Sequence, residues 1–207
     1  MKAIVFDFDG TLYSCENPLK KIIDQRTVEF LHNNSVKDIE SLEQRIPNIL
    51  EALDYLSLER EKYIEFVYDD LKYNNCLKED RILNGLLTQI FCPKIVVSLS
   101  PKKHLMAAMA QLNILSFFDE IVSMCDILQS VNKKSVYLSI LKKNGWNAKN
   151  VMCVGDSYEI DLMPAKQLGM TVFLCSGRAV DDKNVKSFND IKVCLAYILD
   201  SQSNNLK

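Results

Sequence analysis

Five short apolar runs recur along this chain, each about as long as one buried β-strand. They lie at residues 2–7, 94–100, 120–124, 150–157 and 170–176. From residue 94 onward, stretches with helical spacing of apolar residues follow the runs, at 101–113, 133–145, 159–169 and 188–200. Strands that alternate with helices form right-handed β-α-β units and hence a parallel sheet. The pattern predicts an α/β fold with a Rossmann-like, three-layer core.

The segment between the first and second runs has a different character. From residue 18 to 91 the apolar residues recur at helical spacing, as in PLKKIIDQRTVEFLHNN, and glycine is absent from residue 11 to 84. Helix-breaking residues and alternating strand patterns are therefore scarce in it. We predict an all-helical domain at 14–92, inserted into a core built from 1–13 and 93–207.

Charge and cysteine content limit which binding partners and which cellular location the sequence predicts. Residues 14–92 carry ten basic and fifteen acidic side chains, and the rest carries fifteen and twelve, so neither part predicts a surface for polymeric nucleic acid. No apolar run reaches the roughly 18 residues of a membrane span, and from the pattern of the first residues we expect no signal peptide. Seven cysteines without a C-x-x-C pair favour reduced thiols and a cytoplasmic location. The sequence indicates no oligomeric state.

Polar residues stand where the predicted strands end. Asp7 and Asp9 follow the first strand, Ser98 lies near the end of the second, and Asp156 and Asp161 follow the fourth. Ligands of parallel α/β sheets bind at the carboxyl ends of the strands. If the topology is right, these side chains meet at one edge of the sheet.

Four carboxylates at one edge would repel one another and raise each other's pKa. A hard divalent cation with oxygen ligands, such as Mg²⁺, removes this conflict. A hydroxyl from Ser98 and a lysine at 133 or 134 would supply what a phosphoryl group needs, and Gly10 would let the loop backbone approach it. The sequence therefore predicts a magnesium site that handles phosphoryl groups.

The motifs D-x-D-G-T at 7–11 and G-D-S-x-x-x-D at 155–161, together with Ser98 and the lysine, resemble those of the haloacid dehalogenase superfamily of phosphohydrolases. The resemblance covers residues 2 to about 175. In that family, a helical insert after the first strand is a C1-type cap over the active site, and residues 14–92 match its placement.

The resemblance implies a role for each position. Asp7 would be the nucleophile, and Asp9 the general acid and base. Mg²⁺ would be held by Asp7, the Asp9 carbonyl, Asp156 and Asp161. The residues that contact the substrate phosphate would be Gly10, Thr11, Ser98, Leu99 and Lys133. Lys134 is the alternative to Lys133.

The chain departs from the family pattern at two places. Leu99 stands where relatives often have Asn, and the usual K-P-x-P context of the lysine is missing. Spacing favours Lys133 over Lys134, and strand register favours Ser98 over Ser100. His32 and His104 lie in helical segments without evident partners, so we predict that both are surface residues. Tyr63, Phe66 and Tyr68 are expected in the interior of the insert.

The start of the insert is similar to that of pyrimidine 5′-nucleotidase-like members of the family, through Leu12, Tyr13, Ile23, Asp24 and Arg26. The resemblance implies a phosphatase for a small phosphorylated metabolite, with a nucleoside 5′-monophosphate as one candidate. A sugar phosphomutase or other phosphotransferase, and a phosphoglycolate phosphatase, share the same motifs. A dehalogenase needs neither Asp9 nor Asp156, and a phospho-accepting receiver domain carries neither a nucleophile at this strand nor a cap.

Overall fold

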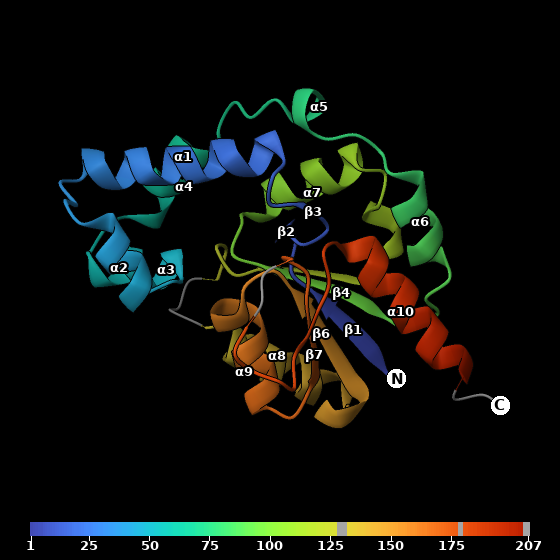
Figure 1. Ribbon diagram of the computed structural model, residues 1–207. Helices are drawn as coiled ribbons and strands as arrows, with labels where there is room; N and C mark the ends of the chain where they lie inside the picture. The colour runs from blue at the N-terminus through green and yellow to red at the C-terminus, as the bar shows by residue number, and fades with distance from the viewer. Residues whose placement is uncertain (128–131, 178–179, 205–207) are drawn as a thin grey trace.

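The computed structural model of the chain describes residues 1–127, 132–177 and 180–204, and six strands within these ranges form one parallel sheet (Figure 1). In spatial order the strands are β5 (Glu120–Ser123), β4 (Lys94–Ser98), β1 (Ala3–Phe6), β6 (Val151–Gly155), β7 (Thr171–Leu174) and β8 (Lys186–Ser187). Every pairing is parallel. The carboxyl ends of β1, β4 and β6 therefore lie side by side.

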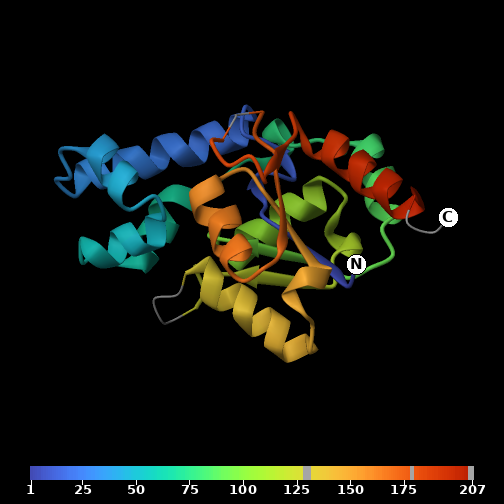
Figure 2. The same cartoon turned by 60° about the horizontal axis from the view of Figure 1, so that its bottom comes forward.

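Helices cover both faces of this sheet and complete three layers. They are α7 (Lys102–Gln111), α8 (Lys133–Asn144), α9 (Met163–Gln167) and α10 (Ile191–Asn204). Figure 2 shows α8 and α9 on one side of the strands and α7 and α10 on the other. Burial on both faces explains why β1 is apolar at every position and almost inaccessible to solvent. The predicted α/β class and Rossmann-like core are confirmed.

The segment between β1 and β4 is helical apart from the short strands β2 (Asp9–Gly10) and β3 (Tyr13–Ser14) at its start. It contains α1 (Pro18–Asn33), α2 (Ile39–Arg45), α3 (Ile49–Tyr55), α4 (Arg60–Tyr68), α5 (Tyr73–Cys76) and α6 (Arg81–Thr88). The helices α1–α4 form a lobe beside the sheet (Figures 1 and 2). By contrast, α5 packs against α7 and α6 packs against α10. The domain boundaries at 13/14 and 92/93 stay a prediction, but these two helices belong spatially with the core layers.

Local sequence explains where the elements begin and end. The Asn17 side chain accepts a hydrogen bond from the Leu19 amide, and Pro18 occupies the first turn of α1. Helix α8 ends at Gly145, whose φ of 63° is the left-handed conformation that glycine adopts without strain. Caps of this kind made these helix ends visible in the sequence.

Some local structure differs from the expectation. The predicted helix at 159–169 is instead a π-helical turn, Tyr158–Leu162, followed by α9. Pro164 has no amide hydrogen to donate to a carbonyl one turn earlier, so a regular α-helix cannot run through this point. Two short strands were not predicted beside Asp9, β2 (Asp9–Gly10) and β3 (Tyr13–Ser14), and neither was β8.

The predictions about cysteines and membrane spans can be compared with the described residues. All seven cysteines lie among the described residues, and each is free. Of the helices that the structure describes, none combines the length and apolar character needed to span a bilayer.

Candidate active site

Asp7 stands directly after the central strand of the sheet. Its amide still donates to the Val154 carbonyl of β6 at 2.9 Å, so the backbone here is held in strand register. Its carboxylate accepts from Thr11 Oγ1 at 3.1 Å and from Lys133 Nζ at 2.7 Å. The side chain is 8 % exposed and is therefore fixed from both oxygens in a largely dry environment.

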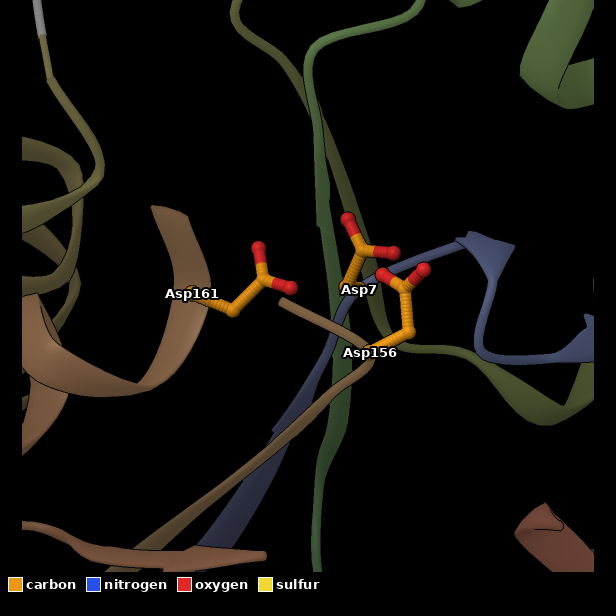
Figure 3. Close-up of side chains that lie close together, drawn as sticks. All are labelled: Asp7, Asp156 and Asp161. Carbon is orange, nitrogen blue, oxygen red and sulfur yellow. The ribbon is translucent and has the colours of Figure 1, made fainter. Parts of the chain in front are cut away.

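Three carboxylates meet at this point (Figure 3). Asp7, Asp156 and Asp161 each offer an oxygen, and these oxygens lie within 4.8 Å of one another. Figure 3 shows Asp7 and Asp156 side by side, with Asp161 reaching toward them from another direction. The expected convergence of these acids at one sheet edge is what the structure shows.

Two glycines permit this approach. A Cβ at Gly10 would lie 2.4 Å from Oδ2 of Asp156, and a Cβ at Gly155 would lie 2.5 Å from Cβ of Asp161. Gly10 also has a φ of 93°, which side chains with a Cβ rarely adopt. Each glycine of the two motifs is therefore required by the position of an acid.

A single buried lysine joins two of the acids. Lys133, at the first turn of α8, donates through Nζ to Asp7 at 2.7 Å, to Asp161 at 2.6 Å and to the Val97 carbonyl at 3.0 Å. Lys134 points elsewhere and donates to Gln167 on the surface. The structure therefore places the first lysine of the pair at the site and the second outside it.

The charges in this cluster do not balance. Burial, and then the neighbouring acid Asp161, raise the pKa of Asp156 to about 7. Burial also raises the pKa of Asp7, although Lys133 works against that rise. Burial tends to lower the pKa of Lys133, but its two acidic partners outweigh this and raise it. Three crowded carboxylates against one ammonium group leave negative charge for a divalent cation, so the oxygen donor set fits such an ion.

Asp9 is held in a separate hydrogen-bonded cage. Its Oδ1 accepts from Tyr13 Oη at 2.5 Å and lies 3.3 Å from Nε2 of His104. Its Oδ2 accepts from Ser100 Oγ at 2.6 Å and from Ser98 Oγ at 3.2 Å. Burial would raise the pKa of Asp9, but hydrogen bonds from His104, Ser100 and Tyr13 hold it well below its usual range.

The cage is tied to the helical segment by two tyrosines. Tyr68, at the end of α4, lies 3.2 Å through its hydroxyl from Ser100 Oγ, and Tyr73 of α5 lies 3.1 Å from Nδ1 of His104. Both partners contact Asp9 directly. The position of the Asp9 carboxylate is thus linked to the last part of the lobe and the helix that follows it.

A cavity of about 250 Å³ opens between these groups and the lobe. We call its polar side the floor, formed by Asp7, Asp9, Ser98, Lys133, Asp156 and Asp161. We call its apolar side the roof, formed by Ile23, Leu31, Leu42, Ile46, Ile49 and Ala52 of α1–α3 and their connections. Leu99 also lines the cavity, whereas Gly10 and Thr11 line a neighbouring one.

The prediction that His104 is a surface residue was wrong. Its side chain is buried, because it shares one face of α7 with the buried residues Leu105, Ala108 and Met109. The spacing of His104 and Ala108, one helical turn apart, was the signal that could have found it. His32 is exposed, as predicted. Tyr63 is buried in the lobe, as predicted, and it lines the cavity together with Tyr68. The prediction for Phe66 was wrong, because its side chain is exposed.

Sequence reasoning also left Tyr13 without a role and ranked Ser100 below Ser98. The structure brings both serines and Tyr13 to the same carboxylate. No spacing rule indicates these contacts, because they depend on the turn that β2 and β3 make after the first strand.

Buried aspartates and one lysine meet at the carboxyl ends of the strands of a Rossmann-like parallel sheet, which is where enzymes of this fold class bind their ligands. The family model of haloacid dehalogenase-like hydrolases matches residues 4–175, and the chain belongs to this family. None of the curated proteins compared matches the chain.

Solved structures share the fold across nearly the whole chain. A protein from Thermotoga maritima assigned as a β-phosphoglucomutase has a TM-score of 0.64 at 18 % identity and covers 97 % of this chain and 99 % of its own. A HAD phosphatase from Thermococcus onnurineus has a TM-score of 0.54 at 19 % identity, with coverages of 96 % and 98 %. An L-2-haloacid dehalogenase from Xanthobacter autotrophicus has a TM-score of 0.60 at 14 % identity, with coverages of 96 % and 98 %. At these identities the likeness establishes the fold.

Proposed function

We propose that the protein is a Mg²⁺-dependent phosphatase, which hydrolyses a small phosphomonoester through an aspartyl-phosphate formed on Asp7. One observation carries this proposal: the Asp7 carboxylate is held by Lys133 and Thr11 beside two further acids, in the floor of a cavity large enough for a small ligand. An anchored carboxylate beside a cation site is suited to attack phosphorus, because nucleophile and charge stabilisation coincide.

In the first step, an oxygen of Asp7 forms a bond to phosphorus while the bond from phosphorus to the ester oxygen breaks. The leaving oxygen takes a proton from Asp9 and departs as an alcohol. In the second step, Asp9 removes a proton from water, the water oxygen bonds to phosphorus, and the bond to Asp7 breaks. The products are the alcohol and inorganic phosphate, and both aspartates return to their starting states.

The cage around Asp9 bears on both halves of this reaction. Its hydrogen bonds favour the ionised carboxylate, which is the form that accepts a proton from water. To act as an acid, Asp9 has to give up part of this hydrogen bonding before it can carry a proton at neutral pH. Because Tyr68, at the end of the lobe, contacts Ser100 of the cage, movement of the lobe would change these hydrogen bonds.

The magnesium ion would be held by the carboxylates of Asp7, Asp156 and Asp161 and the carbonyl of Asp9. When bound, it would offset the negative charge of the phosphoryl oxygens and of the acids around them. Lys133 and Ser98 would position the phosphoryl group from the floor. The segment of Gly10 and Thr11 and the backbone at Leu99 remain proposed phosphate contacts.

Phosphate release from phenyl phosphate tests the proposal. We expect turnover with Mg²⁺, none after chelation, and loss of turnover in Asp7→Asn. Asp70→Asn is a matched control, since Asp70 is exposed in the segment after α4. Full activity of a folded Asp7→Asn variant would remove the proposed nucleophile.

A phosphotransferase is the second candidate, favoured by the fold shared with the Thermotoga protein. It would use the same floor but pass the phosphoryl group to a sugar rather than to water, which product analysis distinguishes. Among phosphatase substrates, nucleoside 5′-monophosphates and phosphoglycolate belong in the first panel. The ionisable Asp9 and Asp156 favour phosphoryl chemistry over dehalogenation. We expect a cytoplasmic protein that acts on a small phosphorylated metabolite.

A further inference from the structure

The charge of the cavity changes sharply between floor and lobe. Among the described residues that line it, two are cationic, Lys20 and Lys133. Lys133 is committed to Asp7 and Asp161 in the floor. Lys20, on α1, forms an ion pair with Asp24 one turn later, and Asp24 lines the same cavity. Lys20 is therefore the one lobe-side cation among the described lining residues, and its charge is already shared with Asp24.

The remaining charge on the lobe side is negative. Asp24 is matched by Lys20, and Glu43 of α2 lies exposed at the edge of the cavity. A carboxylate or phosphate on the leaving group would enter an apolar region, lose hydration and face these acids without a counter-ion. A cationic group would gain little, because the Asp24 charge is already paired and that of Glu43 is screened by water.

The hydroxyl groups on this side are also already paired. The hydroxyl oxygens of Thr27 and Tyr63 lie 3.1 Å apart, and the Tyr68 hydroxyl is hydrogen-bonded to Ser100 Oγ. The rest of the lining on this side is the hydrocarbon surface of the roof, of which Ile46 and Ile49 are partly exposed. Binding on this side therefore comes from apolar contact, which is non-directional and scales with buried area.

The size of the cavity sets a further limit. Its volume of about 250 Å³ includes the space above the floor that the phosphoryl group would fill. Pockets for drug-sized ligands measure roughly 300–1,000 Å³. The part left under the roof suits a compact leaving group rather than an extended one.

We propose that the leaving group is a small, uncharged alcohol with a substantial apolar or aromatic surface. The proposal rests on the phosphatase function proposed above and gives its substrate class. It disfavours esters that carry a second anionic group, such as phosphoglycolate and sugar bisphosphates, because the one lobe-side cation among the described lining residues, Lys20, is already paired with Asp24. By the same reasoning, a phosphoryl transfer that passes through a sugar bisphosphate is disfavoured relative to hydrolysis.

A matched pair of esters tests the substrate class. Benzyl phosphate and 4-carboxybenzyl phosphate release alcohols of similar reactivity, because the carboxylate is remote from the reacting oxygen. With Mg²⁺ present, we expect kcat/KM for benzyl phosphate to be higher by about tenfold or more. An ester with a 4-aminomethyl group should show no advantage over benzyl phosphate.

A designed cation sharpens the test. Ile49, on α3, lines the roof, and Ile49→Arg should raise the relative kcat/KM of the carboxylated ester about tenfold or more. Ile49→Met, which adds length without charge, should keep the wild-type preference. The corresponding non-hydrolysable benzylphosphonates give a second readout by thermal shift, in which the uncharged compound should stabilise the wild type more.

The outcomes separate the two proposals. Equal or better use of the carboxylated ester, or better use of the aminomethyl ester, while phosphate is released from all three, would overturn the substrate class and leave the phosphatase function standing. If none of the esters is hydrolysed by the folded protein with Mg²⁺, the phosphatase function falls. In that case a stronger thermal shift from the carboxylated phosphonate would also contradict the apolar cavity.

Discussion

The floor of the cavity consists of charged and polar side chains, most of them held by hydrogen bonds to one another, whereas the roof consists of six apolar side chains. The floor comes from the ends of β1, β4 and β6 and the first turns after them, and the roof comes from the lobe. Low dielectric and exact pairing make each floor contact individually important. Apolar contacts are spread over many atoms, so single changes in the roof should alter which ester is used more than whether it is used.

The largest effect should follow removal of the buried lysine. We expect Lys133→Met to lower kcat by at least ~10²-fold, because the phosphoryl group and Asp7 lose their positive partner. Lys134→Met is the matched control and should retain wild-type kcat, since Lys134 contacts Gln167 on the surface. Steady-state kinetics on phenyl phosphate, with circular dichroism to check folding, decide between the two lysines. An Lys134→Met variant as impaired as Lys133→Met would refute this part of the floor.

A smaller effect should follow loss of a cage residue. We expect His104→Ala to lower kcat about tenfold with little change in KM, less than the ~10²–10⁴-fold that general acid–base catalysis supplies in full. His104→Gln keeps a donor and should recover part of the loss, and His32→Ala on the exposed surface should have no effect. A rise in KM at constant kcat would show that His104 binds substrate instead of positioning Asp9.

The smallest expected effect is that of pH on how strongly Mg²⁺ stabilises the protein. The raised pKa of Asp156, about 7, means that its protonated form is favoured in the fold. Its contribution to stability is present below the ordinary pKa of an aspartate and is lost as pH rises through about 7. Mg²⁺ binds the ionised form of Asp156. The rise in the protein's melting temperature on adding Mg²⁺ should therefore be larger at pH 8 than at pH 6. Asp156→Asn should reduce the difference between the two pH values, and the raised pKa of Asp7 should account for what remains. An equal gain in the wild type at both pH values would contradict the assignment.

Much of the fold could be predicted from the sequence, and the reason is local. The strands are short, rich in β-branched residues and bounded by polar residues. Pro18 marks the start of one helix and Gly145 the end of another, each within a few positions. Helix α6 packs against α10, more than one hundred residues away in the sequence, and no local pattern indicates that contact. The π-helical turn before α9 was missed although Pro164 gave a physical signal for it.

The candidate site divides in the same way. The acids could be placed because each follows a strand, and parallel topology brings strand ends together. The contacts of Tyr13 and Ser100 with Asp9 could not, since they depend on the turn after β1 and on the path after β4. The roof could not be predicted either, because which faces of α1–α3 turn toward the floor is set by tertiary packing. The roles of these residues stay predictions until they are measured.

Trapping the covalent intermediate tests the central claim most directly. The protein would be mixed with Mg²⁺ and phenyl phosphate, quenched in acid within the first turnover and analysed by intact-protein and peptide mass spectrometry. The proposed mechanism predicts a gain of one phosphoryl group on the peptide that contains Asp7, and its absence in Asp7→Asn. Release of phosphate by the wild type without any phosphorylated protein, together with an active Asp7→Asn variant, would contradict it.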